Sequence, residues 1–159
     1  MTKEQIQEFT RRISQENHSG FILILCDMIH VYVEDALHAY DEEDAVKYIR
    51  QMELAKQSLN ELIACFAPGH ALSRRVINIL RFIYGKFVKS VVKGKPDELD
   101  RCLGMIDNLR VGFVKIHEMD PEGPVMTNTH QVYAGLTYGR GTLNESIQGV
   151  DYKNRGYQA

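Results

Sequence analysis

Residues 45–66, with the sequence AVKYIRQMELAKQSLNELIACF, repeat apolar side chains every three or four positions. A helix of 3.6 residues per turn places side chains with this spacing on one face, and such a face is stable in water only when other elements cover it. The stretch therefore predicts a helix that packs against neighbouring helices. Its repeating positions are Ala45, Tyr48, Ile49, Met52, Ala55, Leu59, Leu62, Ile63 and Phe66.

Two later stretches have the same spacing, and an apolar-rich stretch with Ser19 as its predicted N-cap comes before all three. The breaks between them are short, and short connections force consecutive helices to run antiparallel. We therefore predict an all-α fold, an antiparallel up-down four-helix bundle formed by residues 20–40, 42–66, 71–93 and 97–118. The later repeats are Leu72, Val76, Ile79, Leu80, Ile83 and Phe87, then Leu99, Cys102, Leu103, Ile106, Leu109, Phe113 and Ile116.

A short extra helix is expected before the bundle, over residues 2–16. Thr2 and Gln5 have the spacing of a capping box, and Phe9 and Ile13 share one helical face with further apolar positions. The helical domain is therefore predicted to span residues 1–119.

Residues 120–159 differ in composition, because they hold half of the 12 glycines and half of the 8 tyrosines and have no helical period. This composition predicts a C-terminal tail that is extended or disordered. Residues 125–143 alternate enough to lie extended in an apolar groove, with Tyr133 and Tyr138 as anchors. The groove could belong to the same chain or to a second copy, so the tail could also mediate self-association.

The charge balance is nearly even, with 19 Lys and Arg against 21 Asp and Glu. It provides no general basis for binding nucleic acid or an anionic membrane, so we expect neither. Residues 21–33 are strongly apolar, but they are too few to span a bilayer and include Asp27 and His30.

The three cysteines, Cys26, Cys65 and Cys102, lie far apart, each inside an apolar helical stretch. This placement favours buried, reduced thiols in a cytoplasmic protein over a disulfide framework or a zinc site.

Two of the predicted helices carry apolar side chains outside the face that the bundle core needs. Either these helices touch neighbours on two sides, or the extra side chains form a groove for an amphipathic helix of another chain. In the second case the groove consists of Ile24, Met28 and Val31 on the first bundle helix and Ile77, Tyr84, Val88 and Val91 on the third. Phe82 points elsewhere, among Arg75, Lys86 and Lys89.

No catalytic motif is present, so we expect no enzyme activity and no cofactor. The best constellation for chemistry is Asp27, His30, Glu34 and His38, which share one helical stripe and include metal-ligand types. Dinuclear metal sites in bundles draw ligands from several helices, and the other helices here offer no matching Glu-x-x-His pair. The stripe is interpreted as a solvated face, and no metal is predicted.

Three stretches resemble the flagellar secretion chaperone FliS family. Residues 21–27, FILILCD, are similar to the apolar run that opens the family's first long helix. Residues 40–44, YDEED, match the acidic turn of its helix pair. Residues 94–99, GKPDEL, followed by Leu109, Arg110, Phe113 and Ile116, look like its final turn and helix.

The resemblance covers about 100 residues and implies a cytoplasmic, non-enzymatic chaperone. Such a chaperone binds the C-terminal segment of flagellin and prevents premature polymerisation before export. The family's N-terminal Tyr, which covers the binding groove, has no counterpart, and Phe9 is the nearest aromatic residue. The alternatives are a metal-binding bundle enzyme or a generic helical adaptor.

Overall fold

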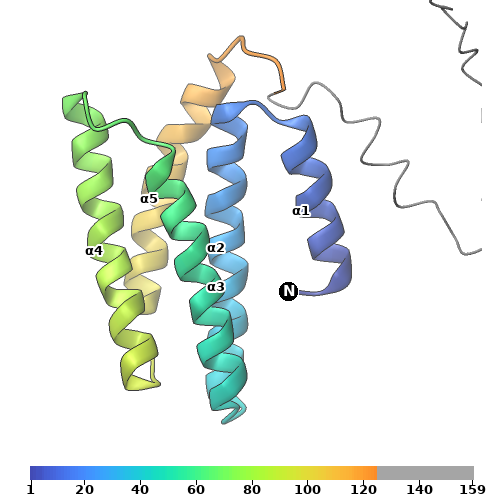
Figure 1. The fold of residues 1–159 in the computed structure, drawn as a ribbon, viewed down its shortest axis with the longest axis vertical. Helices are drawn as coiled ribbons and strands as arrows, with labels where there is room; N and C mark the ends of the chain where they lie inside the picture. The colour runs from blue at the N-terminus through green and yellow to red at the C-terminus, as the bar shows by residue number, and fades with distance from the viewer. Residues whose placement is uncertain (125–159) are drawn as a thin grey trace, which may run out of the picture. The chain divides into compact units, whose positions relative to one another are not determined.

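The computed structural model describes residues 1–124, and the secondary structure of this part of the chain is helical, with no strand (Figure 1). The all-α prediction is therefore confirmed for these residues. The helices are α1 (Lys3–Gln15), α2 (His18–Asp41), α3 (Ala45–Ala64), α4 (Ala71–Lys93) and α5 (Leu99–Glu118). Residues 125–159 lie outside the described part, so the predictions of a tail, of its docking and of self-association through it stay predictions.

The first two helices begin at side-chain caps. In α1, Thr2 accepts a hydrogen bond from the backbone of Gln5, and the Gln5 side chain accepts one from the backbone of Thr2, which completes the predicted capping box. In α2, the cap is Asn17, whose side chain accepts from the backbone N–H of Gly20. The prediction that Ser19 caps α2 is wrong, because Asn17 satisfies the free donors two residues earlier.

Gly94 ends α4 in a left-handed conformation, with φ of 63°, which a residue without Cβ adopts at low cost. Its backbone N–H bonds to the carbonyl of Val91, and the N–H of Lys95 bonds back to Ser90. The chain thereby turns at once toward α5, whose first residue is Leu99.

The central helix of the fold is α2, which packs most extensively against α3 and also against α5. The remaining helix α4 packs against α3 and α5, whereas α1 packs mainly against α2 (Figure 1). One continuous core is formed by the four helices α2, α3, α4 and α5. Its largest fully buried side chains include Ile29, Tyr48, Met52, Leu59, Leu62, Leu80, Ile83, Phe87 and Ile106.

None of the helices within residues 1–124 has the length and apolar character needed to cross a bilayer.

Candidate partner-binding surface

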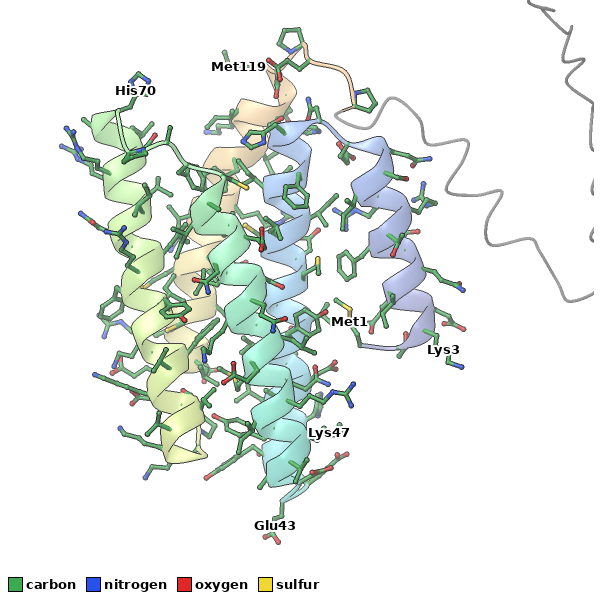
Figure 2. The ribbon with its side chains drawn as sticks, viewed as in Figure 1. Met1, Lys3, Glu43, Lys47, His70 and Met119 are labelled. Atoms are coloured by element: carbon green, nitrogen blue, oxygen red, sulfur yellow. The ribbon has the colours of Figure 1, made fainter. Side chains whose placement is uncertain are left out.

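Two ionic contacts determine how α1 lies on α2. Near the end of α1, Arg12 Nη2 lies 2.8 Å from Asp27 Oδ2, and at its start the amino group of Met1 contacts Asp35. Figure 2 shows Met1 lying between the start of α1 and the central helices. The start of α1 therefore meets Asp35 and its end meets Asp27, so the two helices run antiparallel, and Phe9 lies on α1 between these two contacts.

The groove residues predicted on α2, Ile24, Met28 and Val31, share the helical face of Asp27 and Asp35 and therefore lie beneath α1. Ile24 is only 1% exposed and Phe9 only 9%, yet neither side chain belongs to the main core. Met28 and Val31 are half-buried and also stand outside that core. These side chains form a small second apolar layer whose outer wall is α1.

Asp27 joins three helices at the edge of this layer. Its two carboxylate oxygens accept hydrogen bonds from Arg12 of α1 and from Arg110 of α5, each at 2.8 Å. The guanidinium of Arg12 also lies over the ring of Phe9, 5.6 Å from its centre. These side chains are only partly buried, so the ion pairs still reach water.

The groove residues predicted on α4, Ile77, Tyr84, Val88 and Val91, have a different environment. Ile77 is buried, and Tyr84, Val88 and Val91 are half-buried, with Tyr84 and Val91 packed against the core. Lys86, two positions from Tyr84 and thus about 200° around the helix, pairs with the residues just before α5. The groove residues on α4 therefore face away from α5 and toward α3, the other neighbour of α4.

The two predicted sets of groove residues are not walls of one groove between their helices, because α2 and α4 make no substantial direct contact. Helical periodicity predicts that both sets of residues are apolar surfaces, but it does not predict which neighbouring helix each set faces. The assignment of these seven residues to partner binding stays a prediction. Three of them lie beneath α1, and the other four lie on the side of α4 that faces α3.

An open pocket of about 380 Å³ lies where α1 ends, α2 begins and α3 ends. Its apolar lining includes Ile13, Phe21 and Cys65, and the carboxylates of Glu16 and Glu61 also line it. A Cβ at Gly20 would overlap the carboxylate of Glu16, so glycine at this position lets Glu16 lie over the first turn of α2.

The alternative metal site gains no support within residues 1–124. Asp27 is already bound by two arginines, His30 Nε2 lies 2.8 Å from Asp107 Oδ1, and Glu34 and His38 are exposed. Among these residues, no three side chains of metal-ligand type converge.

The prediction that the cysteines are buried is confirmed for two of the three. Cys26 and Cys102 are buried, and desolvation raises the pKa of their thiols to about 12 and about 11. Such thiols are protonated at neutral pH and chemically inert. Cys65 is half-buried instead, because α3 ends at Ala64 and Cys65 occupies its C-cap.

The residues that sequence reasoning missed are Arg12 and Arg110, which hold Asp27. No local sequence pattern could have predicted these pairs, because Asp27 lies 15 positions from Arg12 and 83 positions from Arg110 along the chain.

Comparison of the chain with models of protein families, with curated proteins and with solved structures gave no match.

Proposed function

We propose that this protein is a cytoplasmic export chaperone of the FliS type, which binds the C-terminal segment of flagellin and prevents its polymerisation before secretion. The proposal combines the sequence resemblance with one structural observation, the apolar layer beneath α1. It involves no catalysis and no cofactor.

The proposed architecture is an antiparallel up-down four-helix bundle of α2 to α5, with α1 as an additional helix. Three short connections, residues 42–44, 65–70 and 94–98, favour antiparallel neighbours. The pairs α2–α3, α3–α4, α4–α5 and α2–α5 are in contact, as expected when four helices surround one core.

The observation that carries the proposal is how α1 is held on α2. Helix α1, an amphipathic helix of 13 residues, is held by Asp27 and Asp35 over the face of α2 that carries Ile24, Met28 and Val31. An amphipathic helix from a client has the shape and chemistry to cover the same strip. Methionine suits a surface that meets more than one partner, because its unbranched side chain repacks easily.

Client binding would then be an exchange in which a flagellin helix displaces α1. Each large apolar side chain that a client buries contributes about 1.5–3 kcal/mol. Part of this gain offsets the ordering of the client, which is disordered before it binds. The displaced α1 makes few apolar contacts of its own, so its removal costs less than the removal of a bundle helix.

Titration calorimetry with the C-terminal segment of flagellin from the same organism tests the proposal. We expect binding at micromolar concentrations, weakened at least about tenfold by Met28→Asp, because a carboxylate placed in an apolar layer is poorly solvated. Met119→Asp is the matched control, since Met119 is 83% exposed and should be replaceable without effect.

Absence of binding at tens of micromolar would reject the flagellin assignment and favour a generic helical adaptor. Binding that is equally strong in Met28→Asp and in the unmodified protein would reject the layer under α1 as the site. The two failures are therefore distinguishable.

A further inference from the structure

The charge of the described chain is distributed very unevenly. Helix α4 carries six Lys or Arg residues and no Asp or Glu, although the whole chain has a net charge of −2. Outside α4, residues 1–124 contain ten Lys or Arg and 19 Asp or Glu. One basic helix therefore stands on an otherwise acidic protein.

Four of these six cations have no acidic partner among residues 1–124. Lys86 pairs with Asp97 and Glu98, and Lys93 lies 3.9 Å from Asp97. The other four cations are exposed and make no ion pair within the described part of the chain. They are Arg74, Arg75, Arg81 and Lys89.

The same outward face has an apolar centre. Phe82 is 45% exposed, and Lys86 Nζ lies over its ring at 5.9 Å from the centre. Gly85 is exposed beside it, and a Cβ built there would meet no atom within 4 Å. An aromatic side chain next to an open glycine leaves room for a partner to approach the backbone of α4 closely.

We propose that the outward face of α4, meaning Arg74, Arg75, Arg81, Phe82, Gly85 and Lys89, binds an acidic amphipathic helix of another protein. The helix would place apolar side chains on Phe82 and Gly85, and carboxylates on either side of them would pair with the four free cations. This surface is separate from the layer beneath α1, so the inference does not depend on the flagellin proposal.

The dimensions favour a short helix over a nucleic acid. The unpaired cations extend along α4 from Arg74 to Lys89, which gives a basic strip roughly 22 Å long at about 1.5 Å per residue. A longer polyanion would extend over the acidic remainder of the protein and be repelled, whereas a helix of a few turns stays on the strip.

The test uses a fluorescently labelled helical peptide of about 18 residues, with Leu along one face and Glu on both sides of it. Anisotropy should show binding to the full chain at micromolar concentration, weakened several-fold when salt rises from about 50 to about 200 mM. A peptide with Gln in place of every Glu should bind at least about tenfold more weakly.

The decisive variant is Arg75→Glu combined with Lys89→Glu, which should reduce peptide affinity at least about tenfold. Its matched control is Lys3→Glu combined with Arg50→Glu, because both residues are exposed, lie on other helices and change the net charge equally. Phe82→Ala should weaken binding about fivefold, and Ile116→Ala on α5, at 54% exposure, should have no effect. Circular dichroism checks that each variant is folded.

Equal losses in the two charge-reversal variants would overturn the proposal, because attraction would then depend on net charge alone. Tighter binding of a single-stranded RNA of about 20 nucleotides than of the peptide would assign the surface to nucleic acid instead. Self-association that is abolished by the Arg75 and Lys89 reversals would assign it to a second copy of this chain.

Discussion

Helices α1 and α3 both pack on α2, but they are attached to it in different ways. Between α2 and α3 lie side chains with no exposed surface, such as Ile29, Met52 and Leu59. Between α1 and α2 the apolar contact is confined to a small layer around Phe9, and charged groups complete the attachment. The first interface belongs to the core of the fold, whereas the second can open while the fold persists.

The energies of the two interfaces follow from these contents. Each large apolar side chain removed from water contributes about 1.5–3 kcal/mol, and α3 supplies many of them. Helix α1 supplies few, and an isolated helix of 13 residues is only marginally stable in water. Opening of α1 should therefore require much less free energy than global unfolding.

The largest expected effect is from Leu59→Ala in α3. This change should lower the free energy of unfolding by about 2–5 kcal/mol, because it leaves a cavity in a fully buried site. Urea denaturation followed by circular dichroism measures it. Ile6→Ala, at a position of α1 that is 52% exposed, is the control and should change stability by less than about 0.5 kcal/mol. Similar effects from both variants would contradict the contrast between the helices.

Phe9→Ala should release α1 without unfolding the bundle. Loss of the main apolar contact should raise the rate of tryptic cleavage after Arg11 and Arg12 at least about tenfold. The unfolding midpoint of the remaining helices, measured by circular dichroism, should hardly change. An unchanged cleavage rate would show that Phe9 does not hold α1.

Asp27→Asn should have a smaller effect of the same kind. The change removes the carboxylate charge that pairs with both Arg12 and Arg110 at a partly buried site. It should lower the free energy needed to open α1 by about 1–2 kcal/mol. Cleavage within α1 should increase less than in Phe9→Ala. Glu34→Gln, on the same helix and exposed, provides the control and should leave cleavage unaltered.

The smallest effect concerns the ion pairs of Glu98, which lies just before α5. Hydrogen bonds from Lys86, and then from Arg101, hold the pKa of Glu98 below its usual value of 4.5. Because the folded pKa is the lower one, this stabilisation is present above pH 4.5 and is lost as pH falls through the folded pKa. NMR titration should show the pKa of Glu98 rising toward 4.5 in Lys86→Met. A pKa that does not move would mean that the pair is not formed in solution.

Much of this contrast could be predicted from the sequence, but not the attachment of α1. Apolar spacing predicts the helices and the inward side chains of α3, because burial of such a face is a local property of the helix. The face of Phe9 and Ile13 is equally visible, yet which helix it covers depends on Arg12 meeting Asp27 in the folded chain. The same limit applies to Tyr84 and its apolar neighbours on α4, because which helix they face depends on how the bundle helices are arranged.

The boundary of α2 illustrates a second limit. Asn17 and Ser19 are both good caps by residue type, and the helix begins after Asn17. In the structure the hydroxyl of Ser19 donates to the Asn17 side chain and contacts His117 Nδ1 at 2.9 Å. That contact spans 98 positions, so local pattern alone could not have selected the cap.

Hydrogen exchange of the unmodified protein, resolved by helix, tests most directly the claim that α1 is a detachable cover on a stable bundle. We expect amides of α1 to exchange with an opening free energy several kcal/mol below that of amides on the facing sides of α2 and α3. Amides of α1 that exchange only through global unfolding, with the same protection as those of α3, would contradict it.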